Sequence, residues 1–599
     1  MSLKTGLRSH AVGEVSLDLK DQEVRLCAWV ETIRDHGGVL FFHLRDHSGR
    51  IQALADPTIL DEGNWSWANE VHIEYVVQIC GLIRERPEGK DVTWLDSKDI
   101  ELEVRQIEIL GKSKPLPFRP QDHEVVGEEH RLSHRYLDLR SDAMQNTLRM
   151  RSKLVQAIRN AFHGEGFTEI ETPQLAKSTP EGARDFLVPS RVHPGCFYAL
   201  PQSPQIFKQL LMIGGFDRYF QIARCFRDED QRTNRQPEFT QLDLEMAFVE
   251  REDVLQTVEK SLCEALEQID LQVQGGFERM SYQEAMDRYG SDAPDLRFGI
   301  EIQDLTPVFQ ETEFKVFRRI VDQGGIVRAL VVPSNCNASR TDIEWLREEV
   351  GKLGVAEPAW GHLRNGSFES TIAKFWSPEE VSKVAEILDG EENDLVLFMA
   401  GPGEDHFKSI IGELRQRVRD RFELVKDSKE LKFCWVLDFP LFEWDLSTKS
   451  VSPMHHPFTA PKATLEELSC ENPKDLLTLS SNAYDLVLNG QEMGSGSIRI
   501  HDEEIQSIIF KILGMDEELA QQRFGFLLQA LQFGAPPHGG IALGVDRLVS
   551  LLCGTESIRD TIAFPKNKHS HCPLSEAPSK VDFKQLREVH IRSLANSKE

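Results

Sequence analysis

The sequence predicts a multidomain α+β protein in which a small β-rich module precedes a larger region of mixed strands and helices. Residues 24–110 alternate apolar and polar side chains, the period of a half-buried strand. The proline-rich segment 112–120 then separates this module from a region with helical spacing. The 599 residues suffice for about four domains of average size, and residues from about 290 to 425 carry strand and helix patterns of their own.

Composition is typical of a soluble globular protein, with 40% hydrophobic and 28% charged residues. No apolar run approaches the ~18 residues of a membrane span, and the first residues lack the apolar core of a secretory signal. The ten cysteines are scattered without a Cys-x-x-Cys pair, so neither a disulfide scaffold nor a zinc site is expected. We therefore expect a cytoplasmic protein with no membrane contact and no zinc.

The net charge of −28 argues, taken alone, against a nucleic-acid-binding protein, because such proteins usually carry a basic domain. The first 120 residues also hold more acidic than basic side chains. Net charge describes solubility and long-range steering rather than a local patch. A nucleic-acid site on this chain would therefore be a locally basic groove on an acidic body.

The N-terminal module reads as about five short strands, and turn-like segments such as Asp35–Gly38 and Asp46–Gly49 separate some of them. Val24, Leu26 and Ala28 begin the alternation. This many strands in fewer than 100 residues suggest a small barrel, of which the OB-fold is one kind. Periodicity alone is equally compatible with any other small β module.

Helical spacing follows the linker, and the pattern ends at Gly164–Phe167. The residues that carry it are Met144, Leu148, Arg151, Leu154, Ile158 and Phe162. The region from about 290 to 425 reads as an insertion because patterns that suggest chemistry are sparse inside it. Its expected strands are Ile326–Val332 and Asp394–Ala400, and its expected helices are Asp342–Leu353 and Pro378–Leu388.

Phe226–Glu245 is the segment richest in chemically informative residues. An apolar strand runs into Arg227, a charged loop follows, and the next strand begins near Phe239. Gln241, Asp243 and Glu245 share one face of that strand, and Leu242 and Leu244 the other. A fixed guanidinium can bind a phosphate through two hydrogen bonds, and Phe239 offers a flat face to a base. A solvated hairpin with surface ion pairs is the alternative.

Gly539–Leu548 is the second such segment, an apolar strand between glycines that leads into a helix. Glycine permits close approach of the backbone, and Arg547 falls at the junction of strand and helix. Read alone, the segment is a weak signal and favours a packed strand-turn-helix with a surface arginine.

Together the two segments resemble motifs 2 and 3 of class II aminoacyl-tRNA synthetases, and Gly166–Pro173 resembles motif 1, all in the family's order. Further stretches narrow the resemblance to the bacterial type of aspartyl-tRNA synthetase: Ser178–Asp185, Pro201–Lys208, Met454–Phe458, Asn489–Glu492, Gly494–His501 and Ile562–Lys566. The resemblance extends to about residue 575. It implies an OB-fold at 1–111, a hinge at 112–140, an antiparallel-sheet catalytic domain at 141–290 and 426–575, an inserted α/β domain of the GAD type at 291–425, and a C-terminal extension at 576–599.

The resemblance implies activation of L-aspartate with ATP and transfer of the aspartyl group from its adenylate to tRNA. This chemistry depends on positioning and charge neutralisation, with Arg227 and Arg547 as catalytic residues. Phe239 and Arg547 would sandwich the adenine, and Asp485 and Glu492 would hold Mg²⁺. The ATP-binding residues implied are Arg227, Asp228, Glu229, Gln236, Phe239, Glu492, Gly544, Val545, Asp546 and Arg547.

For aspartate, the family pattern places two cations, Arg499 and Lys208, at the side-chain carboxylate. Glu181, Asp243 and either Ser203 or Gln205 would lie near the ammonium group, and the histidine pair at 455–456 would close the pocket. Asparagine in such a pocket would leave buried cations unpaired. The full set implied is Glu181, Ser203, Gln205, Lys208, Arg227, Asp243, His455, His456 and Arg499.

For tRNA, the positions that match the family's anticodon contacts are Arg34, Phe41 and Gln52. Phe42 is the better candidate for the barrel core, because its face is uniformly apolar. His36 and Gly89 resemble bacterial enzymes that charge both tRNA-Asp and tRNA-Asn, which would require an amidotransferase downstream; plain turn residues are the alternative interpretation. Motif 1 implies a homodimer.

The sequence is compatible with three other functions. A discriminating enzyme would charge tRNA-Asp only, and a class II synthetase for asparagine or lysine would share the barrel and the motifs. The pocket cations and the large insertion argue against the latter. A non-charging paralogue usually loses the barrel or the motif arginines, and this chain keeps both.

Overall fold

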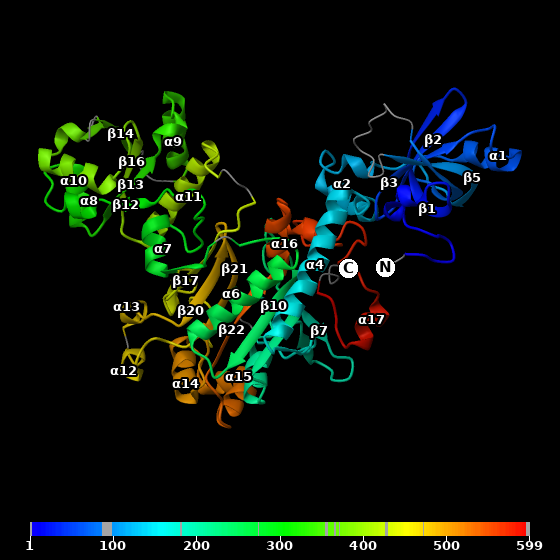
Figure 1. The fold of residues 1–599 in the computed structure, drawn as a ribbon. Helices are drawn as coiled ribbons and strands as arrows, with labels where there is room; N and C mark the ends of the chain where they lie inside the picture. The colour runs from blue at the N-terminus through cyan, green and yellow to red at the C-terminus, as the bar shows by residue number, and fades with distance from the viewer. Residues whose placement is uncertain are drawn as a thin grey trace. The chain divides into compact units, whose positions relative to one another are not determined.

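The computed structural model describes residues 3–86, 99–179, 183–273, 275–353, 358–364, 367–370, 372–425, 429–470 and 472–594. It divides into two compact units, Met1–Gln145 and Asn146–Glu599, whose ribbons and elements are labelled in Figure 1. Within the described ranges, no helix has both the length and the apolar character needed to cross a membrane.

The N-terminal unit contains a closed five-stranded barrel, with strand order β1-β2-β3-β5-β4. Helix α1 (Glu62–Glu70) lies between β3 and β4 in the chain. The closed barrel decides between the two β architectures that periodicity left open. Its strands are β1 (Glu23–His36), β2 (Val39–Arg45), β3 (Arg50–Ala55), β4 (Val76–Glu85) and β5 (Ile100–Gly111).

The alternation in β1 fills the barrel core, since Val24, Leu26 and Ala28 are all buried. Phe42 is 0% exposed in that core, whereas the neighbouring Phe41 remains partly exposed, as the apolar pattern predicts. The turn from β1 to β2 requires glycine, because Gly37 and Gly38 have φ values of 66° and 87°.

Short helices follow the barrel, α2 (Glu128–Ser133) and α3 (Arg135–Asp138). Asp138 is fully buried beside His123, Arg131 and Arg135. Burial alone would raise the pKa of Asp138, but the hydrogen bond from His123 and the charges of Arg135 and Arg131 hold that pKa below its ordinary value. These contacts stabilise the segment that follows the barrel.

The C-terminal unit is built on an eight-stranded sheet of order β11-β17-β20-β21-β22-β10-β9-β6. The sheet is antiparallel except at its two edges, where β11 pairs with β17 and β6 with β9 in parallel. Its strands are β6 (Thr168–Glu169), β9 (Arg218–Phe226), β10 (Glu238–Ala247), β11 (Glu278–Ser281), β17 (Phe433–Leu437), β20 (Ala483–Leu488), β21 (Gln491–Ile498) and β22 (His538–Gly544).

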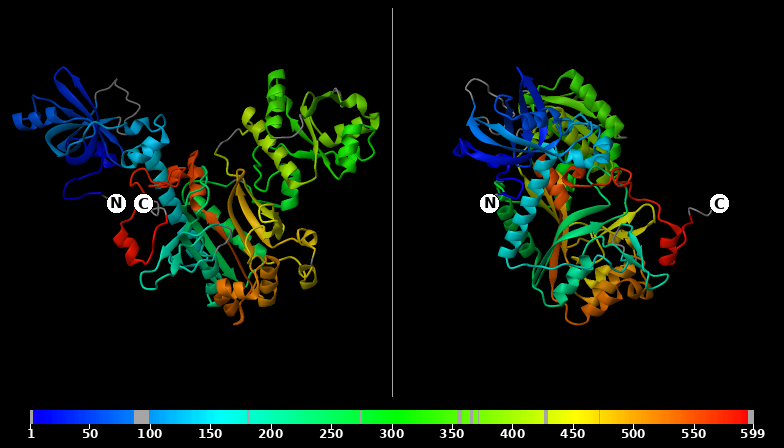
Figure 2. Two further views of the ribbon diagram at one scale, coloured as in Figure 1. Left: turned by 180° about the vertical axis from the view of Figure 1, so that it is seen from behind. Right: turned by 90° about the vertical axis from the view of Figure 1, so that its right-hand side faces the viewer.

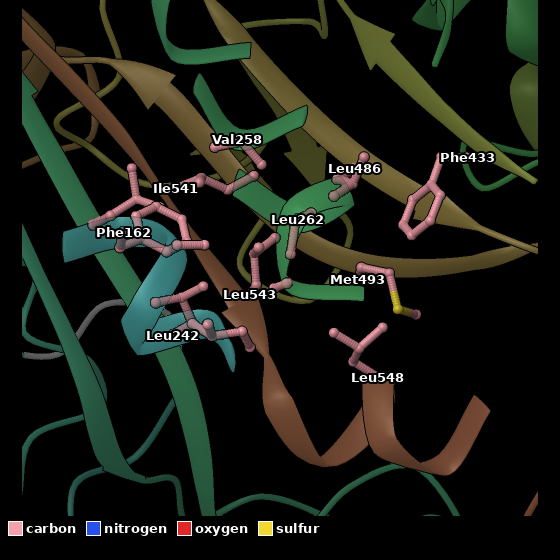
Figure 3. Close-up of a cluster of buried hydrophobic side chains, with 14 of the residues drawn as sticks. Phe162, Leu242, Val258, Leu262, Phe433, Leu486, Met493, Ile541, Leu543 and Leu548 are labelled. Atoms are coloured by element: carbon pink, nitrogen blue, oxygen red, sulfur yellow. The ribbon is translucent and has the colours of Figure 1, made fainter. Parts of the chain in front are cut away.

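Three helices cover one face of this sheet: α4 (Asp142–Gly164), α6 (Arg251–Glu267) and α16 (Val545–Cys553). Helices α4 and α6 run along that face in Figures 1 and 2. Figure 3 shows Phe162 of α4, Val258 and Leu262 of α6, Leu548 of α16 and Leu242 of β10 within one buried cluster. The predicted helix after the linker is therefore confirmed as α4.

The inserted region has its own five-stranded sheet of order β12-β13-β16-β14-β15. Helices α9 (Arg340–Lys352) and α11 (Asp405–Arg421) pack on one face, and α8 (Lys315–Asp322) and α10 (Pro378–Leu388) on the other. The two predicted helices are confirmed as α9 and α10, and the two predicted strands as β13 and β16. The strands are β12 (Ile302–Asp304), β13 (Ile326–Val332), β14 (Ala359–Arg364), β15 (Ser367–Ser370) and β16 (Leu395–Gly401).

Smaller elements complete the C-terminal unit. Two short hairpins are β7 (Leu187–Pro189) with β8 (Phe197–Ala199), and β18 (Phe442–Asp445) with β19 (Ser450–Pro453). The remaining α-helices are α5 (Gln205–Ile213), α7 (Tyr282–Tyr289), α12 (Leu465–Leu468), α13 (Pro473–Leu476), α14 (Glu503–Ile512), α15 (Glu517–Leu531) and α17 (Phe583–Glu588).

Candidate active site

A cavity of about 400 Å³ lies on the face of the large sheet opposite the α4–α6 layer. Strand β10 explains why: Leu242 and Leu244 enter the apolar core, whereas Gln241 and Asp243 line the cavity. This confirms the division of faces that the alternation in β10 predicts. Strands β21 and β22, helix α5 and the loop between β9 and β10 supply most of the remaining wall.

Four buried charges lie at the floor of the cavity, and each of these side chains is 1% exposed or less. Lys208, Asp243 and Arg499 line the cavity, whereas Glu245 does not line it but binds Lys208 and Arg499. Lys208 Nζ lies 2.6 Å from Asp243 Oδ1 and 3.2 Å from Glu245 Oε2. Arg499 donates from Nε and Nη2 to the two oxygens of Glu245 at 2.9 and 3.1 Å. Both cations therefore already have carboxylate partners, whereas the sequence predicts them as free partners for the substrate carboxylate.

The charges set the protonation of the groups around them. Burial alone would raise the pKa of Glu245, but Arg499 and Lys208 hold that pKa below its ordinary value. Burial also lowers the pKa of His456 well below its ordinary range, and the charge of Arg499 adds to this effect. Arg499 Nη1 lies 2.6 Å from His456 Nε2, so neutral His456 accepts this hydrogen bond.

Gly540 of β22 lies so close to β10 that no side chain fits at this position. A Cβ atom built on Gly540 would lie 2.2 Å from Glu245 Oε2 and 2.1 Å from the carbonyl oxygen of Leu244. Only glycine therefore lets β22 lie against the buried carboxylate of β10. The Gly540 carbonyl also accepts a hydrogen bond from Arg499 Nη2 at 3.2 Å.

Two arginines and a phenylalanine line another part of the cavity. The Arg227 backbone N–H donates to the Pro237 carbonyl at 2.9 Å and closes the loop between β9 and β10. The Arg227 guanidinium lies 5.1 Å from the centre of the Phe239 ring. Arg547, in the first turn of α16, donates to the Glu492 carbonyl. These side chains could therefore bind a ligand that combines negatively charged groups with a planar ring, such as a nucleotide.

Asp485 and Glu492 lie on the adjacent strands β20 and β21. Asp485 Oδ1 is 3.1 Å from His455 Nε2, and desolvation together with the charge of Asp485 raises the pKa of Glu492. Within the described ranges, no three His, Cys, Asp or Glu side chains are placed to hold a metal ion. Mg²⁺ usually takes one or two carboxylates and completes its shell with phosphates and waters, so this repelling pair fits Mg²⁺.

The structure brings most of the predicted ATP and aspartate residues to this one cavity. They are Ser203, Gln205, Lys208, Arg227, Glu229, Gln236, Phe239, Asp243, His455, His456, Glu492, Arg499, Gly544, Asp546 and Arg547.

Three predicted residues lie elsewhere in the described structure, and one lies outside it. Asp485 stands behind His455. Asp228 is absent from the cavity lining, and its backbone N–H donates to the Arg184 carbonyl at 3.0 Å. Val545 packs in the core under the sheet. Glu181 is outside the described residues.

Sequence reasoning missed two structural roles. Glu245 was placed on the polar face of its strand but given no function, although it binds both Lys208 and Arg499. Asp546 was placed with ATP, but its Oδ2 accepts the Thr240 backbone N–H at 2.7 Å and its Oδ1 pairs with Arg151. The contacts of Glu245 and Asp546 depend on how distant strands pair, which the pattern of residues within one segment does not indicate.

In the barrel, the predicted anticodon residues fall on neighbouring strands. Arg34 of β1 is the cross-strand partner of Phe41 in β2, and Gln52 of β3 is the partner of His43. The Gln52 amide donates to Glu101 Oε2 at 2.9 Å. His36 is exposed beside the β1–β2 turn, and Gly89 lies outside the described residues.

The mostly antiparallel sheet, with a helical layer on one face and an arginine-lined cavity on the other, is the arrangement that the resemblance to class II aminoacyl-tRNA synthetases implies. The family model "tRNA synthetases class II (D, K and N)" matches residues 127–568, and the model "OB-fold nucleic acid binding domain" matches residues 24–110. The chain belongs to the class II tRNA synthetases of the D, K and N group.

Curated relatives match almost the whole chain. The chain is 47% identical over 599 residues to "Aspartate--tRNA(Asp/Asn) ligase" of Hydrogenobaculum sp. (strain Y04AAS1), covering 98% of this chain and 100% of that one. It is 46% identical to the protein of the same name from Thermodesulfovibrio yellowstonii, covering 98% and 99%. Among solved structures, asparaginyl-tRNA synthetase from Pyrococcus horikoshii complexed with asparaginyl-adenylate shares the fold, with a TM-score of 0.57 at 18% identity and coverage of 93% and 97%.

Proposed function

We propose that the chain activates L-aspartate with ATP and transfers the aspartyl group, through aspartyl-adenylate, to tRNA-Asp and tRNA-Asn. The observation that carries this proposal is the buried cluster of Lys208, Asp243, Glu245 and Arg499 on the cavity floor. The names of the two curated relatives favour the same activity. We place this reaction in the cytoplasm.

The floor of the cavity suits aspartate because the substrate carries one ammonium group and two carboxylates. Arg499 and Lys208 would bind the side-chain carboxylate, and Asp243 would compensate the ammonium group. Since Glu245 already balances much of the cationic charge, the substrate carboxylate would share the guanidinium with it. Ser497 Oγ, which accepts from Arg499 Nη1 at 2.6 Å, and neutral His456 help to hold the guanidinium in place.

The arginine-lined part of the cavity suits ATP. Arg227 would bind the α-phosphate that the aspartate carboxylate attacks, and Phe239 and Arg547 would hold the adenine from its two faces. Asp485 and Glu492 would hold Mg²⁺, which neutralises phosphate charge when bound. Gln236 fixes the wall of this region, because its side chain exchanges hydrogen bonds of 2.9 and 3.0 Å with the Lys566 backbone.

On the barrel, Phe41 would stack on an anticodon base, and Arg34 and Gln52 would bind base edges. The tRNA-Asp and tRNA-Asn anticodons differ only in the third base, C or U. The His36 imidazole can donate or accept a hydrogen bond, so it would tolerate both bases. The product on tRNA-Asn then needs a tRNA-dependent amidotransferase to become Asn-tRNA.

We also expect a homodimer with a two-fold contact at the β6 edge of the large sheet, where motif 1 lies. Phe216 and Phe248 are 42% and 72% exposed near one end of the adjacent hairpin β9–β10, where the Ala247 N–H donates to the Asp217 carbonyl. Sedimentation at micromolar concentration should show a species of twice 68.2 kDa. A single 68.2 kDa species would refute the dimer.

Pyrophosphate exchange tests the activity directly. The protein should exchange labelled pyrophosphate into ATP when aspartate is present, with a kcat/KM for aspartate at least about 10⁴-fold above that for asparagine. Equal exchange with asparagine or with lysine would assign the chain to another amino acid. Intact ATP binding without exchange for any of the three amino acids would identify a non-charging paralogue.

A further inference from the structure

The turn between β20 and β21 connects the strands that carry Asp485 and Glu492, and it consists of Asn489 and Gly490. Their φ values are 53° and 80°, as a tight hairpin turn of this kind requires. A strand irregularity lies between Leu486 and Val487. It separates the pairs next to the turn, including the Val487–Glu492 pair, from the rest of the ladder. The position of Glu492 therefore depends on what holds the turn.

Asp295, at the entry to the inserted region, lies directly against this turn. A Cβ atom on Gly490 would come within 2.9 Å of Asp295 Cβ. Asp295 is 0% exposed, and its carboxylate binds Arg297 at 2.7 Å and Arg419 of α11 at 3.0 Å. Its carbonyl oxygen accepts from Arg415 Nη2, also of α11, at 2.8 Å.

The exit from the inserted region holds the other side of the turn. The Asn489 side chain donates to the Glu430 carbonyl at 2.7 Å and accepts the Lys432 backbone N–H at 2.9 Å. The Asn489 backbone N–H donates to the Lys432 carbonyl at 3.1 Å. Both connections of the inserted region therefore meet at one two-residue turn.

Helix α11 is itself fixed against α7, its neighbour in Figure 1. A Cβ atom on Gly412 of α11 would lie 2.2 Å from the Gly290 carbonyl oxygen. The Arg415 guanidinium lies 4.0 Å from the centre of the Phe298 ring and 4.9 Å from that of Tyr289. Asp295 thus joins the hairpin of Asp485 and Glu492 to a helix that has little room to move.

We propose that Asp295 is a positioning residue for the ATP site: it holds the Asn489–Gly490 turn against α11 and so fixes Glu492. This inference rests on the proposed function in one respect, namely that Glu492 helps to bind ATP together with Mg²⁺. It gives the inserted region a part in ATP binding, although that region supplies no side chain to the cavity lining within the described residues.

Gly490→Ala tests the contact because the added methyl group must push the turn away from Asp295. Gly514→Ala is a matched control, since Gly514 also has a positive φ of 75° but has nothing within 4 Å of an added Cβ. Asp295→Ala removes the anchoring carboxylate, and Asp295→Asn keeps its shape without its charge. Each variant is titrated calorimetrically with ATP in MgCl₂ and with ATP in EDTA, and its KM for aspartate is measured by pyrophosphate exchange.

Gly490→Ala and Asp295→Ala should weaken ATP binding in MgCl₂ about tenfold while changing binding in EDTA and the aspartate KM little. Asp295→Asn should lie between Asp295→Ala and the native protein, and Gly514→Ala should match the native protein in every titration. Unchanged ATP binding in Gly490→Ala and Asp295→Ala, or an equal loss for ATP and aspartate, would overturn the inference. Absence of exchange in the native protein would refute the proposed function instead. The calorimetric comparison of ATP binding would still decide whether Asp295 positions the ATP site.

Discussion

Arg227→Ala is expected to reduce aspartate-dependent pyrophosphate exchange by about 100- to 1,000-fold, a loss of about 3–4 kcal/mol of transition-state stabilisation. The guanidinium lies in the cavity wall over the Phe239 ring, where it can bind charge that develops at the α-phosphate. The effect should fall mainly on kcat, since the interaction strengthens as that charge develops.

Arg224→Ala is the matched control for this prediction. Arg224 lies on β9, three residues before Arg227, but its guanidinium pairs with Glu238 at 2.7 Å and is absent from the cavity lining. It should keep exchange within about threefold of the native rate, a change of under 1 kcal/mol. An Arg227→Ala protein with exchange within about tenfold of the native rate would refute the role assigned to Arg227.

Arg499→Ala is expected to lower kcat/KM for aspartate by at least about 1,000-fold, or about 4 kcal/mol. The cluster holds two cations and two carboxylates, so removing Arg499 leaves a net negative site that repels the substrate carboxylate. Binding of ATP in MgCl₂, measured by calorimetry, should change little. Retention of aspartate activation by this variant would show that the substrate carboxylate binds elsewhere.

The same substitution should also destabilise the fold by about 3–5 kcal/mol, because it breaks a buried ion pair. Arg499→Lys separates the two effects, since it keeps the positive charge but loses the paired hydrogen bonds to Glu245. It should therefore remain folded and still lose aspartate affinity. A fully active Arg499→Lys protein would mean that charge alone, without the geometry of the guanidinium, selects the substrate.

Helices and strands could be predicted well from the sequence wherever apolar residues kept one helical or strand period along the whole segment. The faces of β10 and the bounds of β13 and α10 follow directly from the spacing of apolar residues. The barrel was predictable as a β module, and its closure became visible only through the pairing of β3 with β5 and of β4 with β5.

The partners inside the cavity could not be predicted in this way. Arg499 and Glu245 are separated by 254 positions in the chain and meet only because β21, β22 and β10 are neighbours in the sheet. For the same reason, the sequence identified the two cations and Asp243 as site residues, but not the ion pair between Asp243 and Lys208 or any role for Glu245. The contact between Asp295 and Gly490 likewise depends on the packing of the inserted region and has no signal in either segment.

Charging transcripts of tRNA-Asp and tRNA-Asn side by side with labelled aspartate tests whether one protein attaches aspartate to both tRNAs. We expect both to be aspartylated, with kcat/KM values within about tenfold of each other, or about 1.4 kcal/mol. A ratio above about 100 in favour of tRNA-Asp, about 2.7 kcal/mol, would contradict the proposed activity toward both tRNAs and identify an enzyme that discriminates between them.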